Sequence, residues 1–121
     1  MDDYQYDCPS ADIDMLAHVI CDLFPEQTQF AERLDENDRT VLSIHYVAMR
    51  FGATARRIRI DIRFAPDALA RYRALPVRMH ARSYAVLRAY VEATLGSLEE
   101  MYAEGQTVPR EMEIEMADDF A

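Results

Sequence analysis

Lysine and tryptophan are absent from this 121-residue chain, and cysteine and glycine are scarce, with two and three copies. The two cysteines, Cys8 and Cys21, are too few for a disulfide framework, so we expect reduced thiols. Three dispersed glycines exclude a glycine-rich phosphate-binding loop. No apolar run approaches the roughly 20 residues needed to cross a bilayer. The acidic start lacks the positive charge of a secretory signal, and we therefore expect a cytoplasmic protein.

The lack of lysine means that all 13 basic residues are arginines. Codon usage in a GC-rich bacterial genome is one explanation. Selection for planar, bidentate contacts to carboxylates or phosphates is the other, because a guanidinium group makes such contacts and an ammonium group does not. The sequence leaves both explanations open.

Charge is segregated along the chain. Residues 1–38 carry 11 acidic side chains and one arginine, residues 39–92 carry 11 arginines and three acidic side chains, and residues 93–121 carry eight acidic side chains and one arginine. The total is −9 at pH 7. Nucleic-acid backbones reward positive surfaces, so this charge argues against nucleic-acid binding except at the basic middle.

The most regular pattern is the segment Arg56–Phe64, RRIRIDIRF. It alternates with a period of two, which predicts a half-buried β-strand rich in branched side chains. The apolar face comprises Ile58, Ile60, Ile62 and Phe64, and the charged face comprises Arg57, Arg59, Asp61 and Arg63. We expect helices to cover the apolar face and the arginines to face outward.

The other predicted elements surround this strand. Ser10 is a candidate N-cap and Pro25 a stop for the first helix, and Gly105 ends the last one. The predicted elements are a helix at 10–24, strands at 28–34 and 39–51, and helices at 67–75 and 79–104. This order predicts a two-layer α+β domain over residues 10–105, in which a three-stranded antiparallel meander packs against N-terminal and C-terminal helices. We expect residues 1–9 to be flexible.

The acidic tail, residues 106–121, has few large apolar side chains and is predicted to be disordered or weakly docked. Its residues 111–116 nevertheless alternate in the manner of a strand, with Met112, Ile114 and Met116 between glutamates. The alternative prediction is a fourth strand whose glutamates face the arginines of the segment Arg56–Phe64, as opposite charges on neighbouring strands attract.

No motif specifies a chemistry. His18 and Cys21 are three residues apart on a predicted helix, but a structural zinc site usually shows two such pairs. No nucleophile elbow or oxyanion turn is present. We therefore predict no metal, no cofactor and no enzymatic activity. An enzyme built on the scattered His18, His45 and His80 is the alternative.

The candidate binding residues are arginines. Arg57, Arg59 and Arg63 share one face of the predicted strand, and Arg50 joins them from the strand before it. One interpretation is that they pair with acidic groups of the same chain or of a second subunit. The other is a face that binds a small anion, a nucleotide or a partner protein.

Surplus apolar surface predicts self-association. The segment 39–51 carries Leu42, Ile44 and Tyr46 on one face and Val41, Val47, Met49 and Phe51 on the other. A strand that is apolar on both faces is normally covered on both. Helix 79–104 is also long enough to pair with its twin. Homodimerisation is therefore expected.

Two resemblances rest on element order and composition, and the motifs themselves identify no family. The α-β-β-β-α order resembles double-stranded-RNA-binding domains, but the segment PVRMHARSYA has Arg78 and Arg82 where those domains carry lysines. Small size, acidity and mixed order are similar to bacterial secretion chaperones, which are dimers that hold an extended client segment. We expect a small non-enzymatic interaction or regulatory protein.

Overall fold

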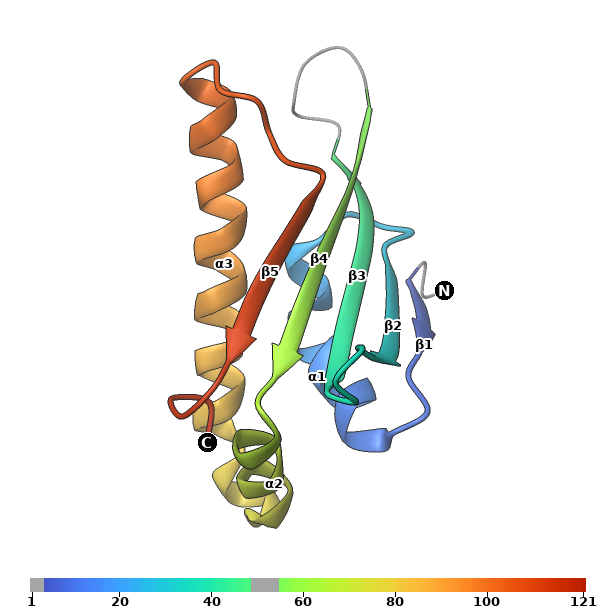
Figure 1. The fold of residues 1–121 in the computed structure, drawn as a ribbon, viewed down its shortest axis with the longest axis vertical. Coiled ribbons are helices and arrows are strands. Elements are labelled where there is room, and N and C mark those ends of the chain that lie inside the picture. Colours follow the sequence, from blue (N-terminus) through green and yellow to red (C-terminus); the bar gives the residue numbers. More distant parts are fainter. Residues whose placement is uncertain (1–3, 49–54) are drawn as a thin grey trace.

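The computed structural model describes residues 4–48 and 55–121, which form two layers, a sheet and a layer of helices (Figure 1). The elements are β1 (Gln5–Asp7), α1 (Ala11–Ile20), the 3-10 helix η1 (Cys21–Leu23), β2 (Gln29–Leu34), β3 (Thr40–Ala48), β4 (Arg56–Phe64), α2 (Pro66–Ala74), the 3-10 helix η2 (Val77–Met79), α3 (Ala81–Ala103) and β5 (Glu111–Met116).

The sheet has five strands in the order β1-β2-β3-β4-β5. Strands β2, β3 and β4 are antiparallel, whereas β1 is parallel to β2 and β5 is parallel to β4. The α+β class is therefore confirmed, but the three-stranded meander is the centre of a larger mixed sheet. The helices α2 and α3 return the chain to the start of β4, and this crossover makes β5 parallel.

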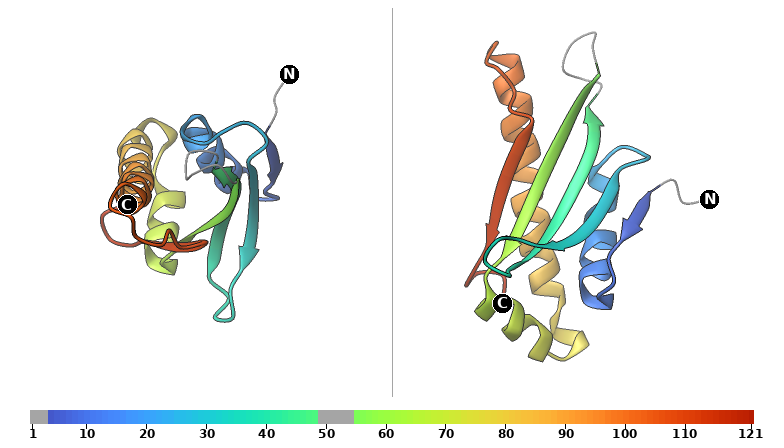
Figure 2. Two further views of the ribbon diagram at one scale, coloured as in Figure 1. Left: turned by 90° about the horizontal axis from the view of Figure 1, so that it is seen from above. Right: turned by 45° about the vertical axis from the view of Figure 1, so that its right-hand side comes forward.

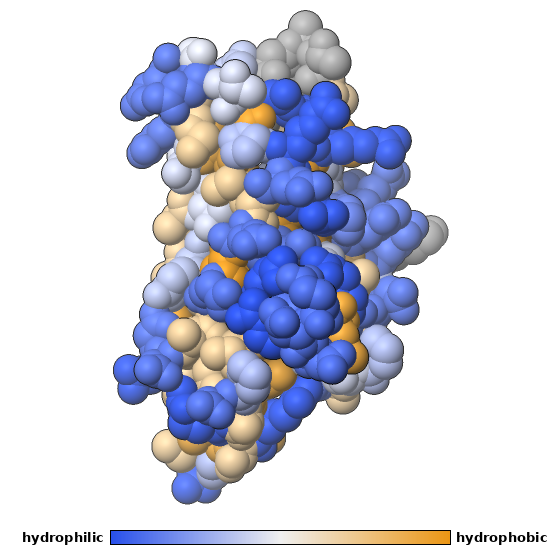
Figure 3. All heavy atoms as spheres, in the orientation of Figure 1, coloured by the Kyte–Doolittle hydropathy of each residue, from blue (hydrophilic) through white to orange (hydrophobic). Residues whose placement is uncertain are grey.

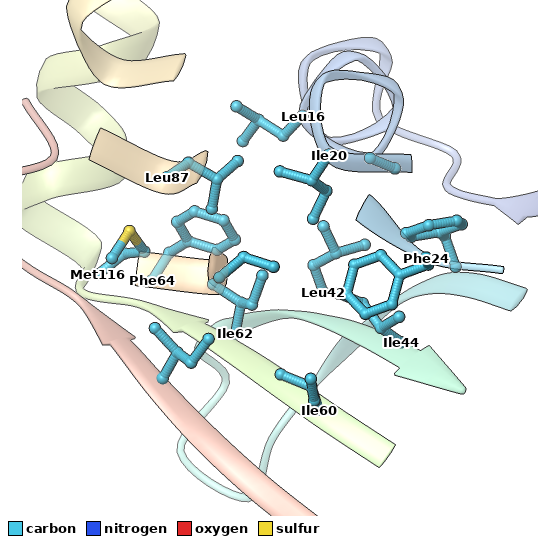
Figure 4. Close-up of a cluster of buried hydrophobic side chains, with 14 of the residues drawn as sticks. Leu16, Ile20, Phe24, Leu42, Ile44, Ile60, Ile62, Phe64, Leu87 and Met116 are labelled. Carbon is cyan, nitrogen blue, oxygen red and sulfur yellow. The ribbon is translucent and has the colours of Figure 1, made fainter. Parts of the chain in front are cut away.

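The apolar side chains that alternate along β4 are buried, as the sequence predicts. The side chains of Ile58, Ile60, Ile62 and Phe64 are all buried in the core. They face Leu42 and Ile44 of β3, and Figure 4 shows this apolar layer meeting side chains from α1 and α3. Burial of this row fixes the register of β4, because a shift by one residue would place arginines in the core.

The helices that the structure describes all pack on one face of the sheet and none of them covers the other face. Figure 2 shows α1 and α3 on the same side, with the curved sheet wrapping around them. From α1 the buried side chains include Leu16 and Ile20, and from α3 they include Leu87, Val91 and Leu98. We call the uncovered face the outer face.

The start of α1 is held by β2 rather than by its own cap. Ser10 occupies the N-cap position, as predicted, but makes no capping hydrogen bond through its side chain. Its hydroxyl and its backbone N–H instead donate to the Glu32 carboxylate, at 2.7 and 2.9 Å. This contact connects the first helix to the second strand.

The N-terminal segment is more ordered than the sequence predicts. Residues 5–7 form β1, the Tyr4 hydroxyl donates to the Phe24 carbonyl at 2.9 Å, and the Tyr6 ring stacks on Phe30. The expectation of a flexible segment at 1–9 is therefore wrong for these residues. A strand of three residues is too short to show an alternating pattern in the sequence. The packing of Tyr4 and Tyr6 holds this segment in place.

The tail was predicted to be disordered or weakly docked, but residues 111–116 form the strand β5 beside β4, as in the alternative prediction. After β5, Phe120 is buried against Phe64 and Tyr72, with ring centroids 5.4 and 5.1 Å away. The Ser83 hydroxyl donates to the Phe120 carbonyl at 2.6 Å. The tail carries few large apolar side chains, but those it has pack against the core of the preceding domain.

The second apolar face of β3 is smaller than expected. Val41 is fully buried, between Arg33 of β2 and Arg63 of β4 in the register, whereas Val47 is exposed. Met49 and Phe51, the other predicted members, lie outside the described residues. Arginine side chains thus flank an apolar group on the outer face, where a partner was expected.

Candidate functional site

The outer face of the sheet is a charged surface built from side chains of all five strands. Figure 3 looks onto this face and shows hydrophilic residues over the strands. The register places outer-face residues of neighbouring strands in rows, one of which runs Gln5, Gln29, His45, Arg59 and Glu111. A second row runs Arg33, Val41, Arg63 and Glu115, and a third runs Asp7, Ala31, Ser43, Asp61 and Glu113.

Asp61 lies at the centre of this face, and its side chain is 3% exposed. One carboxylate oxygen accepts from the Ser43 hydroxyl at 2.7 Å, and the other accepts from Arg33 Nη2 at 2.8 Å. Arg59 Nε lies 3.4 Å from the same oxygen as Arg33. A buried carboxylate needs such partners, because the loss of water around it is otherwise costly.

A second buried carboxylate, Asp35, lies in the turn between β2 and β3 and is fully buried. It accepts from the backbone amides of Arg39 and Asn37, at 3.0 and 2.8 Å, and from the Arg39 and Arg63 guanidinium groups. The Arg39 amide is the largest influence, and together these donors lower the pKa of Asp35 to about 2, although burial opposes them. Asp35 therefore stays charged at neutral pH.

The glutamates of β5 complete the ion pairs of the face. Arg59 Nη2 lies 3.2 Å from Glu111, Arg63 Nη2 lies 2.9 Å from Glu113, and Arg39 Nη1 lies 3.4 Å from Glu115. These three glutamate side chains are 67%, 63% and 57% exposed. Each carboxylate thus contacts one arginine and keeps most of its surface open to water.

A shallow depression of about 490 Å³ lies on the outer face around His45. Its lining includes Gln29, Arg57, Arg59 and Arg110. Within the described part of the chain, Arg57 and Arg110 make no ion pair, and Arg59 Nε is buried without a hydrogen-bond acceptor. Arg57 and Arg110 are therefore the arginines of this depression without an ion pair among the described residues, and Glu26 and Glu111 also line it.

The structure brings most of the predicted arginines together. Arg57, Arg59 and Arg63 lie on one face of β4 as expected, whereas Arg50 lies outside the described residues. Sequence reasoning missed the importance of Asp35 and Asp61. The position of Asp61 beside Arg59 on one strand face was the available signal, whereas its second arginine, Arg33, comes from β2.

The outer edge of β5 pairs with no other strand of the described residues. Arg59 N–H donates to the Arg110 carbonyl and Ala65 N–H donates to the Met116 carbonyl, so even-numbered residues of β5 face β4. In a parallel ladder the odd-numbered residues of β5 then point their N–H and C=O groups away from β4. No strand within 4–48 or 55–121 pairs with these groups, which belong to Glu111, Glu113 and Glu115.

His18, His80 and the two cysteines do not line the depression around His45. His18 stacks on Tyr6, and His80 stacks on Tyr72, with Nε2 3.1 Å from the Leu75 carbonyl. In the part of the chain that the structure describes, no three His, Cys, Asp or Glu side chains are arranged to hold a metal ion. Burial raises the pKa of Cys8 to about 11, which keeps its thiol protonated and unreactive at neutral pH.

The described helices include none that is both long enough and apolar enough to span a bilayer. No curated protein and no solved structure gives a significant match to the chain. Residues 13–117, from within α1 to just beyond β5, match the family described as "Protein of unknown function (DUF3022)". Since this match covers most of the chain, the protein belongs to the DUF3022 family.

Proposed function

We propose that this protein is a non-enzymatic, cytoplasmic interaction protein that binds an extended segment of a partner along the free edge of β5. The observation that carries the proposal is the row of outward backbone groups at Glu111, Glu113 and Glu115. Sheet edges bind extended peptides by adding a strand, with affinity from backbone hydrogen bonds. Binding of an extended segment is also the mode of the secretion chaperones that the sequence resembles.

The charges of the outer face support docking at the edge over docking on the face. Arg59 and Arg63 each contact two acidic side chains of the same chain, so little of their charge is left for a partner. The Arg59 and Arg63 side chains are only 38% and 14% exposed, so few of their N–H donors can reach another molecule. The backbone groups at the edge have no hydrogen-bond partner within residues 4–48 and 55–121.

A matched pair of variants at Glu113 tests this function. Its N–H points away from β4, so Glu113→Pro removes an edge donor without removing a bond of the sheet, whereas Glu113→Ala removes the side chain alone. Both are used as bait in the lysate of the organism that makes the protein. We expect a stoichiometric partner that Glu113→Ala retains and Glu113→Pro loses. Equal capture by both variants, or no partner at all, contradicts the proposal.

We propose homodimerisation through a different surface, the exposed side of α3. Its support is the length of α3, Ala81–Ala103, and the partial exposure of two of its aromatic side chains, Tyr90 and Tyr102. Aromatic groups are enriched in protein interfaces. Sedimentation velocity at micromolar concentration is the test, and a dimer is expected. A single species at 14.0 kDa, the mass of one chain, contradicts this part of the proposal.

The second candidate function is the binding of a small anion or nucleotide in the depression around His45. It is favoured by Arg57 and Arg110, which line the depression and make no ion pair among the described residues. A thermal-shift screen with phosphates and carboxylates tests it, with Arg57→Ala as the binding variant and Arg78→Ala, at an exposed arginine of η2, as the control. Stabilisation that Arg57→Ala alone abolishes supports an anion site. The absence of any shift with the unaltered protein contradicts it.

A further inference from the structure

We propose that the segment bound at the β5 edge has basic side chains at alternate positions and apolar side chains between them. This inference rests on the proposed function and adds the chemistry of the partner. Its basis is that β5 presents three acidic groups on one face and three apolar groups on the other. A strand that pairs with β5 inherits both faces.

The geometry of the edge determines which partner side chains meet the glutamates. In a sheet, residues opposite each other on adjacent strands point their side chains to the same face. The side chains of Glu111, Glu113 and Glu115 lie on the outer face, beside Arg59, Asp61 and Arg63 in the register. Residues of the partner opposite these glutamates therefore lie on the outer face too, within reach of the carboxylates.

The carboxylates have room for a second cation. Each contacts an arginine of the same chain on its β4 side, and each side chain is still more than half exposed. A carboxylate has two oxygens and about four lone-pair sites, so it can accept from two guanidinium or ammonium groups. Each positive side chain at an alternate position of the partner would then lie within ion-pair distance of one glutamate.

The other face of β5 favours apolar side chains in the partner. Ile114 and Met116 are buried in the core, and Met112 is half-buried against it. A partner strand would place its inward residues beside this apolar row, at the margin of the core. Alternation of basic and apolar residues is thus required by both faces of β5.

A second copy of the chain fits this edge poorly. Antiparallel pairing of two β5 strands about a two-fold axis would place the glutamates of one copy opposite the glutamates of the other. Like charges directly opposite each other on neighbouring strands are destabilising. The edge therefore favours a basic partner over self-pairing, and the proposed homodimer uses another surface.

The test is an NMR titration of the ¹⁵N-labelled full chain with three synthetic peptides. One alternates arginine with valine, one alternates glutamate with valine, and the third has the composition of the first without alternation. We expect the alternating basic peptide to bind at least about tenfold more tightly than either of the others, and to shift the amide signals of Glu111, Glu113 and Glu115 most strongly.

Three variants at one position separate the contributions. Glu113→Gln keeps the edge and removes one charge, Glu113→Pro blocks the edge, and Glu113→Arg reverses the charge. We expect Glu113→Pro to abolish binding of the peptides. Glu113→Arg should lower the affinity for the basic alternating peptide by about tenfold and raise the affinity for the acidic one. Glu113→Gln should have an intermediate effect. Thermal unfolding of each variant confirms that it is folded.

The outcomes distinguish this inference from the proposed function. If the acidic and basic alternating peptides bind equally and both are blocked by Glu113→Pro, the edge docks a strand but the partner chemistry is wrong. If no peptide binds up to millimolar concentration, both the inference and edge docking are wrong. If the non-alternating basic peptide binds as well as the alternating one, simple charge attraction replaces the paired strand.

Discussion

Two arginines and a serine converge on the buried carboxylate of Asp61 on the outer face. Asp35 has the same role at the turn that precedes β3. These two aspartates neutralise arginines that otherwise would repel one another within the sheet. The character of the face thus depends on two acidic residues rather than on the more numerous arginines.

Replacement of Asp61 tests this dependence. Asp61→Ala should lower the free energy of unfolding by about 2 kcal/mol, because Ser43 loses its acceptor and the flanking Arg33 and Arg59 lose their counter-charge. Asp118→Ala is the control, since that carboxylate also pairs with an arginine but is 99% exposed. Its effect should stay below about 0.5 kcal/mol. Urea denaturation measures both, and equal effects would contradict a special role for Asp61.

Asp35 predicts a pH dependence of stability. Its pKa in the folded protein is about 2, below the ordinary value of 3.8, so folding favours its charged form. The resulting stability is fully present above about pH 4 and is lost as the pH falls from there toward 2. Asp35→Asn should be less stable at neutral pH and should show a flatter decline of melting temperature over this range. Parallel curves for the two proteins would contradict the assignment.

At the same scale, the sequence predicted the positions of the arginines better than the identity of their partners. Alternation in β4 is a local property, so it correctly placed Arg57, Arg59 and Arg63 on one face. The pairing of Asp35 with Arg63 joins residues 28 positions apart. Such a contact follows from the register of two strands and the shape of a turn, and neither is visible in composition.

Among the elements, β5 and the segment after it depend most on the rest of the fold. The strand joins the sheet through the long connection formed by α2 and α3, and Phe120 then closes the end of the core between Phe64 and Tyr72. The tail therefore contributes to the packing of the domain.

Truncation of one side chain measures that contribution. Phe120→Ala should destabilise the protein by about 3 kcal/mol, because it removes a buried aromatic ring and leaves a cavity. Val77→Ala is the control, at an apolar side chain that is 82% exposed, and should change stability by less than about 0.5 kcal/mol. Thermal or urea unfolding gives the comparison. A small effect of Phe120→Ala would mean that the tail is not packed as described.

The elements differ in how far the sequence predicts them. The strands β2, β3 and β4 and the helices α1, α2 and α3 follow from alternation, helical spacing and the breakers Pro25, Pro76 and Gly105. The strand β1 has three residues and no pattern of its own. In β5 the alternation was visible, but its place beside β4 depends on the path of 46 residues between Phe64 and Glu111. Local patterns carry no information on that path.

At the scale of the whole molecule, folding brings the segregated charges together. The arginine-rich middle of the sequence pairs with acidic residues from both ends: Arg88 with Asp22, Arg63 with Asp35 and Glu113, and Arg71 with Asp118. The net charge of −9 remains as a surplus of exposed carboxylates. That surplus, present along the free edge of β5, favours a basic partner.

The central claim is that β5 is a docked edge strand with one side paired and the other open. Amide hydrogen exchange of the full chain, followed residue by residue by NMR, tests it most directly. We expect slow exchange at Met112 and Ile114, whose N–H groups face β4, and fast exchange at Glu113 and Glu115, whose N–H groups face water. Fast exchange at all four would mean an undocked tail, and slow exchange at all four would mean an edge already covered; either result contradicts the account.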